Sequence, residues 1–230
     1  MPVNIFICGD STAASYDPAQ SLMVGWGQVL GEYLPEAAVF NHAMAGRSTK
    51  SFLAEGRLQA LDGKIQPGDL VLIQFAHNDE NEKPERHTEP WTTFSENLRT
   101  FIAFVRQRSG MPVLLTPICM RVWEQGVMQE THGEYPDAMR AVAAEADVPL
   151  IDVYRESRRI VSEAGEEGSK AFFMHLKPGE DARYPDGLSD NAHTRRKGAE
   201  QFAFCAADGL IRAGLVGRPA AAETKNGGIT

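Results

Sequence analysis

The chain has 230 residues, of which 43% are hydrophobic and 23% are charged. This length and composition are typical of one globular domain with a sizeable core, and they exclude collagen, coiled coil and wholesale disorder. A formal net charge of -8 argues against a nucleic-acid partner, because binding a phosphate backbone needs concentrated Lys and Arg. No apolar run approaches the roughly 18 residues of a membrane span, so we expect no membrane partner.

The three cysteines, Cys8, Cys119 and Cys205, lie inside apolar segments. An odd count without a CxxC pattern predicts buried, reduced thiols and argues against a disulfide framework or a zinc site. The first residues, MPVNIFIC, offer neither the basic region nor the long apolar region of a secretory leader. Together these observations predict a cytoplasmic location.

Five short runs rich in β-branched and aromatic residues predict buried strands, and helical patterns separate them. In chain order, the predicted strands are residues 3–8, 38–43, 69–75, 111–118 and 149–153. The predicted helices are residues 26–34, 51–61, 93–108, 137–146, 154–168 and 197–214. This alternation predicts a parallel sheet covered by helices on both faces, a three-layer α/β/α architecture.

Two long polar segments interrupt the pattern, and residues 76–90 and 175–193 are both predicted to be loops. Residues 120–136 are predicted to be irregular. Long loops in compact domains are often functional. Residues 217–230 have little to bury, so we predict a single domain over 1–216 followed by a flexible tail.

Polar blocks follow the first three predicted strands. GDST at 9–12 follows the first strand, AGRS at 45–48 follows the second and HND at 77–79 follows the third. DNAH at 190–193 precedes the last helix. A lone GDS is also a common turn. Because ligands gather beyond the carboxyl ends of parallel strands, the joint occurrence predicts that the blocks meet at one edge of the sheet.

These blocks resemble those of the SGNH (GDSL-type) hydrolases over nearly the whole chain. Within that superfamily, the string MHLKPGEDARYPDGLSDNAH at 174–193 looks most like the rhamnogalacturonan acetylesterase family. The resemblance implies a flavodoxin-like fold with a five-stranded parallel sheet. It also implies a serine esterase that removes acetyl groups from pectin-derived, rhamnogalacturonan-type oligosaccharides through an acetyl-enzyme, with no cofactor.

Ser11 and His193 are the predicted nucleophile and general base. A serine hydroxyl needs a base to remove its proton, and a neutral imidazole suits that task near neutral pH. An acceptor must also orient the imidazole, and Asp190, three residues earlier, matches the DxxH of the family. This spacing predicts that one local turn delivers both groups. Asp186 is a rival acid, which we interpret as a turn residue.

The resemblance assigns the oxyanion hole to Ser11, Gly46 and Asn78. Attack on an ester carbonyl develops negative charge on oxygen, which rigid neutral donors stabilise. Gly46 can bring its backbone N–H close because it has no Cβ atom, and Asn78 offers a side-chain amide. Taken singly, each is more typical of a turn or a cap than of an oxyanion hole. Asp10 is predicted to hold the nucleophile turn by hydrogen bonds from its side chain to the backbone.

The candidate substrate-binding residues are Arg47, His77, Trp123 and Tyr184. A sugar site favours aromatic platforms, although aromatic side chains more often fill cores. Guanidinium groups pair with carboxylates, so Arg47, and also Arg121, suits a uronate.

A metal site is considered because His77 and Asp79 flank Asn78 and Asp10 follows the first strand. We predict no metal, since no HExxH, CxxC or acidic-loop signature is present. His87 and His132 are predicted to be solvent-exposed loop residues.

Two other functions stay open. The same scaffold hosts lipases, thioesterases and arylesterases that act on different esters. A catalytically silent carbohydrate-binding protein is the second alternative, although all five proposed catalytic and oxyanion positions are filled. The expected partner is an acetylated oligosaccharide, and the sequence does not indicate an oligomeric state.

Overall fold

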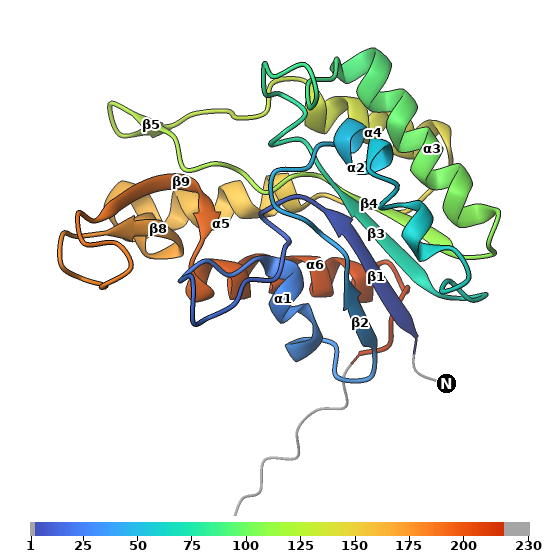
Figure 1. Ribbon diagram of the computed structural model, residues 1–230, viewed down its shortest axis with the longest axis horizontal. Helices are drawn as coiled ribbons and strands as arrows, with labels where there is room; N and C mark the ends of the chain where they lie inside the picture. Colours follow the sequence, from blue (N-terminus) through green and yellow to red (C-terminus); the bar gives the residue numbers. More distant parts are fainter. Residues whose placement is uncertain (1–2, 219–230) are drawn as a thin grey trace, which may run out of the picture.

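A parallel five-stranded sheet runs through the centre of the computed structural model, which describes residues 3–218 (Figure 1). Neighbouring strands are all parallel, in the order β2-β1-β3-β4-β7. This order is that of flavodoxin-like folds, so the predicted fold class is confirmed. In spatial order, the strands are β2 (Ala38–Asn41), β1 (Asn4–Gly9), β3 (Leu70–Gln74), β4 (Met111–Leu115) and β7 (Leu150–Ile151).

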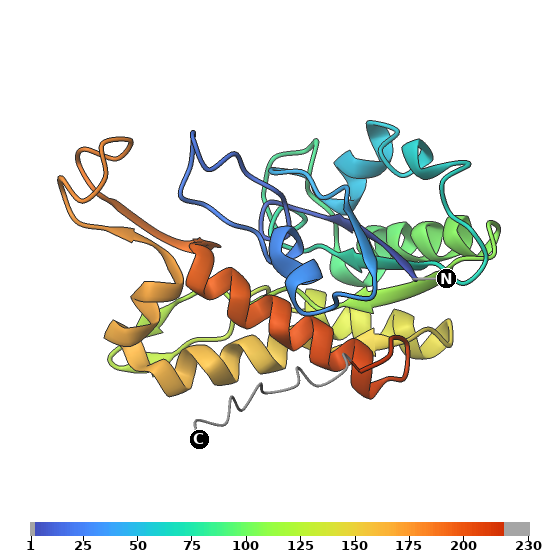
Figure 2. The ribbon, with the colours of Figure 1, turned by 90° about the horizontal axis from the view of Figure 1, so that it is seen from below.

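Helices cover both faces of the sheet. One layer contains α1 (Trp26–Val29), α5 (Val153–Gly168) and α6 (Arg196–Arg212), and Figure 2 shows α6 packed between the other two. The opposite layer contains α2 (Thr49–Ala54), α3 (Ser95–Arg106) and α4 (Tyr135–Glu145). The short helical turns are η1 (Leu30–Glu32), η2 (Gln59–Leu61), η3 (Pro90–Phe94) and η4 (Ser169–Phe172).

The side chains of β1 explain why the sheet needs two helical layers. Ile5 and Ile7 belong to the core beneath α1, α5 and α6. Phe6 and Cys8 belong to the core beneath α2, α3 and α4. Successive side chains of a strand point to opposite faces, so an uninterrupted apolar run is buried only when both faces are covered.

The polar blocks after β1 and β3 lie where the connections of these two neighbouring strands turn toward opposite faces of the sheet. The chain leaves β1 toward the α1 layer and leaves β3 toward the α3 layer. Gly9 pairs with Gln74, so the residues after β1 and after β3 emerge from the sheet at the same level. Such a switch point leaves a crevice between the two carboxyl ends, where ligands bind in open α/β sheets.

The predicted loop at 175–193 is in part wrong, because its two ends form an antiparallel ribbon. β8 (Phe173–Leu176) pairs with β9 (Leu188–Thr194), beyond the carboxyl ends of the central strands at the left of Figure 1. The sequence of β9, LSDNAHT, has no alternating apolar pattern, so pairing with β8 and not patterning defines it. The irregular segment 120–136 likewise contains β5 (Trp123–Glu124) and β6 (Val127–Met128).

The predicted helices 26–34 and 51–61 are shorter than expected. The first continues after Val29 only as a 3₁₀ turn. The second ends at Ala54, because Gly56 adopts a positive φ of 69° that closes the helix.

Cys8, Cys119 and Cys205 are buried free thiols, which confirms that part of the prediction. Burial raises the pKa of Cys8 and Cys119 to about 12, so neither is a thiolate at neutral pH. Between residues 3 and 218, no helix is long and apolar enough to cross a membrane. The predicted tail at 217–230 lies outside the described residues except for its first two.

Replacing Gly198 by alanine should destabilise the fold. A Cβ atom on Gly198 of α6 would lie 2.1 Å from the carbonyl oxygen of Phe172, which accepts a hydrogen bond from the N–H of Arg195. Relieving this overlap must shift backbone, at a cost of about 1–3 kcal/mol, which lowers Tm by roughly 3–10 °C. Thermal unfolding followed by circular dichroism measures the change.

Gly168 provides the matched control for this substitution. It also has helical dihedral angles, and a Cβ atom there would meet no atom closer than 3.9 Å. Gly168→Ala should leave Tm unchanged or raise it slightly, because alanine favours helix more than glycine. An equal loss of Tm in both variants would contradict the steric explanation.

Candidate active site

Ser11 lies in the turn that follows β1 and is 8% exposed. Its Oγ atom lies 3.0 Å from Nε2 of His193, although the two residues are 182 positions apart in the chain. Nδ1 of His193 lies 2.7 Å from Oδ2 of Asp190. The structure therefore brings the three predicted triad residues into one hydrogen-bonded row. A hydroxyl, an imidazole and a carboxylate in this order can activate the hydroxyl as a nucleophile.

The local geometry of Asp190 and His193 depends on an irregularity in β9. Met174 pairs with Asp190 and Phe173 pairs with Thr194, so residues 191–193 bulge out of the ladder. Within the bulge, Oδ1 of Asp190 accepts hydrogen bonds from the N–H groups of Ala192 and His193, at 2.8 and 3.0 Å. The local turn expected from the DxxH spacing is thus a bulge within a strand.

The surroundings of Asp190 keep its carboxylate ionised. Burial alone would raise the pKa of Asp190, but hydrogen bonds from the His193 side chain and from two backbone N–H groups outweigh it. The pKa falls to about 2. The carboxylate is therefore charged at the pH where an imidazole can act as a base.

Arg121 supports the bulge from inside the protein. Its backbone N–H donates to the carbonyl oxygen of Asn191 at 2.8 Å, and Nη1 donates to Oδ1 of the same residue at 3.2 Å. Nε donates to Oγ of Ser169 at 3.1 Å, and Nη2 donates to the carbonyl oxygen of Glu166. Arg121 is 6% exposed, so the suggestion that it meets a uronate carboxylate is wrong.

Residues 15–25 join the Ser11 turn to β9. Val24 and Thr194 exchange hydrogen bonds: the N–H of Val24 donates to the Thr194 carbonyl at 2.9 Å, and the Thr194 hydroxyl donates to the Val24 carbonyl at 2.6 Å. The hydroxyl of Tyr16 donates to the carbonyl oxygen of Ser11 at 2.8 Å. Sequence reasoning missed Tyr16, because no local pattern indicates a contact with the turn before it.

Asp10 holds the nucleophile turn, as predicted. Its Oδ1 atom accepts hydrogen bonds from the N–H and the hydroxyl of Thr12, at 2.9 and 2.7 Å. Its Oδ2 atom lies 3.2 Å from Nδ1 of His77. Burial by itself would raise the pKa of Asp10, but the neighbouring His77 and the hydrogen bonds from Thr12 lower it.

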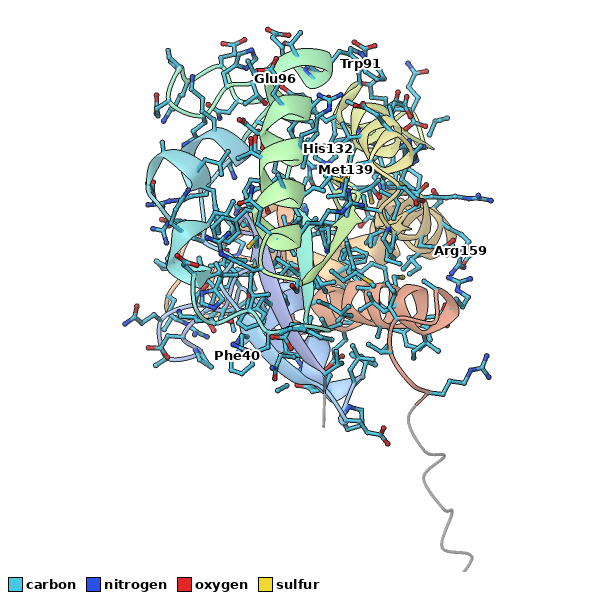
Figure 3. All side chains as sticks on the ribbon, turned by 90° about the vertical axis from the view of Figure 1, so that its right-hand side faces the viewer. Phe40, Trp91, Glu96, His132, Met139 and Arg159 are labelled. Carbon is cyan, nitrogen blue, oxygen red and sulfur yellow. The ribbon has the colours of Figure 1, made fainter. Side chains whose placement is uncertain are left out.

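His132 is buried, so its predicted exposure is wrong. It is 2% exposed and lies well inside the outline of the molecule in Figure 3, whereas Trp91 and Arg159 lie at the rim. Its Nε2 atom lies 2.9 Å from the carbonyl oxygen of Ile118, and its Nδ1 atom lies 3.2 Å from a carboxylate oxygen of Glu80. The polar residues around His132 predicted a surface loop. The contacts with Ile118 and Glu80 instead hold the ring inside the protein.

His77 packs edge-on against His132, with the ring centroids 4.3 Å apart. Burial lowers the pKa of His132, whereas Asp10 raises the pKa of His77 against the effect of its own burial. The side chain of His77 is only 7% exposed. This burial and the bond to Asp10 favour a role inside the protein, and they do not support its predicted contact with substrate.

The two other oxyanion candidates lie in segments that adjoin the Ser11 turn. The N–H of Met44 donates to the carbonyl oxygen of Gly9 at 3.0 Å, which ties the segment after β2 to the end of β1. Gly46, in that segment, has a positive φ of 78° that favours glycine. Asn78 is 9% exposed and its Nδ2 atom donates to the carbonyl oxygen of Arg47 at 3.1 Å.

The remaining substrate-binding candidates lie on three different segments. Nε of Arg47 pairs with a carboxylate oxygen of Glu55 at 3.0 Å. Trp123, on β5, is half-buried and packs against the core. The hydroxyl of Tyr184, in the β8–β9 connection, lies 3.2 Å from Oγ of Ser21. No hydrogen bond of the described part of the chain joins any of the three to the triad, so their contact with substrate stays a prediction.

In the described part of the chain, the acidic and histidine side chains do not converge on a metal site. Over residues 3–218, no group of three or more His, Cys, Asp and Glu side chains is arranged to hold a metal ion.

Comparison with known proteins identifies related sequences over nearly the whole chain. The model of the GDSL-like lipase/acylhydrolase family matches residues 7–200. Rhamnogalacturonan acetylesterase RhgT of Bacillus subtilis is 44% identical over 216 residues, which are 93% of this chain and 92% of the relative. The probable rhamnogalacturonan acetylesterase YesY of the same organism is 39% identical, over 94% of this chain and 95% of the relative.

Solved structures share the fold. The crystal structure of the Bacillus subtilis protein YxiM superposes with a TM-score of 0.78 at 29% identity, over 93% of this chain and 57% of that longer chain. A lipolytic protein of the G-D-S-L family from Veillonella parvula superposes with a TM-score of 0.65 at 16% identity, over 91% of this chain and 99% of that chain. At that identity the second likeness concerns the fold alone.

Proposed function

Since this chain belongs to the GDSL-like lipase/acylhydrolase family, we propose that it is a serine esterase that removes acetyl groups from rhamnogalacturonan-type, pectin-derived oligosaccharides. The observation that carries the proposal is the hydrogen-bonded row of Ser11, His193 and Asp190 at the switch point of the sheet. The 44% identity to a rhamnogalacturonan acetylesterase supports the choice of substrate.

The first half of the reaction transfers the acetyl group to the enzyme. Oγ of Ser11 attacks the acetyl carbonyl carbon while its proton passes to Nε2 of His193, 3.0 Å away. The ionised carboxylate of Asp190 keeps the second imidazole proton on Nδ1 and stabilises the imidazolium. The N–H groups of Ser11 and Gly46 and the amide of Asn78 donate to the carbonyl oxygen as it becomes negative.

Loss of the sugar completes the first half of the reaction, and hydrolysis of the acetyl-enzyme then releases acetate. As the tetrahedral intermediate collapses, the bond between the acetyl carbon and the sugar oxygen breaks, and His193 returns its proton to that oxygen. A water molecule then attacks the acetyl-enzyme, with His193 again accepting a proton. Collapse of this second intermediate restores the hydroxyl of Ser11. Every proton in the cycle passes through one imidazole, and no redox step is needed.

The substrate is proposed to lie over the switch point, between the β8–β9 ribbon and the segments after β2 and β3. Tyr184 from the ribbon connection and Trp123 from β5 are the proposed aromatic contacts. Arg47 is the proposed contact for a uronate carboxylate, in exchange for its pairing with Glu55. His77 is the weakest of the four candidates because of its burial.

An acetate-release screen tests the substrate assignment. Acetylated rhamnogalacturonan oligosaccharides should give the highest kcat/KM, above acetylated xylan fragments, and octanoyl esters should be slower by about 10-fold or more. Faster hydrolysis of octanoyl esters would favour a lipase or thioesterase. Oligosaccharide binding without hydrolysis of any ester would favour a carbohydrate-binding protein.

Two further predictions accompany this function. Both cores pack against the same sheet, which supports a single hydrolase domain over residues 1–216.

The cytoplasmic location, expected from the free thiols, stays a prediction that cell fractionation tests. Recovery of the native protein outside the cell would contradict it.

A further inference from the structure

Arg86 contacts both of the oxyanion candidates that lie outside the nucleophile turn. It lies in the connection between β3 and α3, the polar segment that also carries Asn78, and the sequence suggested no catalytic role for Arg86 itself. Its Nη1 atom donates to Oδ1 of Asn78 at 3.3 Å. Its guanidinium also covers Gly46, since a Cβ atom on that glycine would lie 3.4–3.7 Å from three guanidinium atoms.

The bond from Arg86 determines which way the amide of Asn78 faces. A carboxamide has an acceptor oxygen and two N–H donors. Oδ1 accepts from Arg86, and one N–H donates to the carbonyl oxygen of Arg47, which leaves the second N–H for the substrate. A flipped amide would place N–H against N–H at Arg86 and oxygen against oxygen at Arg47. The flip is therefore unfavourable at both ends.

The segment that carries Arg86 is fixed to the oxyanion segments. The N–H of Thr88 donates to the carbonyl oxygen of Asp79 at 3.0 Å, and its hydroxyl donates to Oδ1 of Asp79 at 2.9 Å. The same carboxylate accepts from the N–H of Thr49, just after Gly46, at 3.1 Å. Asp79 thus holds together the segments of Gly46, Asn78 and Arg86.

Arg86 forms no ion pair with any residue that the structure describes. Considering residues 3–218 alone, no carboxylate lies within ion-pair distance of its guanidinium, whereas Arg47 nearby pairs with Glu55. A positive charge bonded to the amide oxygen also polarises the amide, so its N–H becomes a stronger donor.

We propose that Arg86 is a positioning residue of the oxyanion hole: it holds the Asn78 amide with one N–H toward the acetyl carbonyl oxygen and polarises it. The inference rests on the proposed esterase function. Because the charge on that oxygen develops during the reaction, the effect of Arg86 falls on kcat and not on substrate affinity.

A double-mutant cycle with p-nitrophenyl acetate tests the role of Arg86. Arg86→Ala should lower kcat about 10- to 100-fold with little change in KM, because a misdirected donor loses most of its effect. Asn78→Ala should lower kcat about 100- to 1,000-fold. In the Asn78→Ala background, Arg86→Ala should lower kcat by less than about 3-fold, since no amide remains to be held. Arg86→Lys keeps the charge and loses the planar guanidinium group. Its kcat should lie between that of Arg86→Ala and that of the parent.

Lys83 supplies the matched control. It lies exposed in the same segment, and Lys83→Ala removes the same charge but should change kcat less than about 2-fold. Three results would overturn the proposal: a kcat for Arg86→Ala within 2-fold of the parent, an equal loss in both backgrounds, or a rise in KM alone. The last would indicate direct contact with substrate.

This test is independent of the natural substrate. p-Nitrophenyl acetate carries neither a sugar nor a carboxylate, so it reports only on hydrolysis of an acetyl ester. Failure to release acetate from rhamnogalacturonan fragments would overturn the substrate assignment and leave the cycle intact. Thermal unfolding of each variant separates loss of the fold from loss of kcat.

Discussion

Ser11→Ala should lower kcat for acetyl-ester hydrolysis by about 10⁵- to 10⁶-fold, without loss of the fold. The hydroxyl that it removes is the atom that forms the acetyl-enzyme, and it lies 3.0 Å from its base. His193→Ala should lower kcat by nearly the same factor. The kcat of the double variant should be no lower than that of either single variant, because the two residues act as a unit. Initial rates of acetate release measure all three variants.

Ser15→Ala is the matched control for Ser11→Ala. Ser15 lies exposed in the same segment, and its hydroxyl accepts a hydrogen bond from Asn41 at 3.0 Å. This control should keep kcat within about 2-fold of the parent. A Ser11→Ala protein with parental turnover, or additive losses in the double variant, would contradict the assigned pair.

Asp190→Asn should lower kcat by about 10⁴-fold while the positions of the other groups are kept. The carboxylate now accepts a hydrogen bond from the N–H at Nδ1 of His193, which leaves Nε2 unprotonated and able to take the proton of Ser11. An asparagine can offer an N–H to Nδ1 instead, which favours the opposite tautomer with Nε2 protonated. Single-turnover kinetics with an acetyl ester measure the loss.

The same variant makes a prediction about stability and pH. The pKa of Asp190 is about 2 in the folded protein, below its ordinary value near 3.8, so the ionised carboxylate stabilises the fold above pH 4. This contribution should disappear as the pH falls from about 4 to about 2. The difference in the free energy of unfolding between the parent and Asp190→Asn should therefore shrink over that window, as measured by chemical denaturation at each pH.

Asp186→Asn is the control for both measurements. Asp186 is the rival acid, and it lies exposed in the connection between β8 and β9. Its replacement should leave kcat and the pH dependence of stability close to those of the parent. The assignment of the orienting acid would be reversed if Asp186→Asn inactivated the enzyme and Asp190→Asn did not.

Most of the central sheet could be predicted from the sequence, because a strand buried on both faces appears as an uninterrupted apolar run. β1 and β3 are such runs. β9 could not be predicted in this way, since LSDNAHT has no apolar alternation and pairs only because β8 lies beside it. Helix ends were less predictable, as Gly56 shows by ending α2 early.

The candidate site was predictable where residue type and spacing carry the chemistry. The three-residue spacing of Asp190 and His193 already permits their contact, since one carboxylate can reach a nearby backbone N–H and a nearby ring. Arg86, Tyr16 and His132 have no such signal. His132 meets Glu80, a partner distant in sequence. Arg86 and Tyr16 contact Asn78 and Ser11, which are near in sequence, but the chain between the partners is irregular, so no helix or strand periodicity predicts the contact.

The sequence by itself therefore determined the alternation of strands and helices, the order of the polar blocks and the Asp190–His193 pair, because these depend on neighbouring residues and on the period of the backbone. The tertiary structure alone decided that Ser11 meets His193, that the β8–β9 ribbon carries the base, and that Arg86 holds Asn78. Such contacts join segments up to 182 residues apart, and their geometry is set by how the helices and strands pack as a whole.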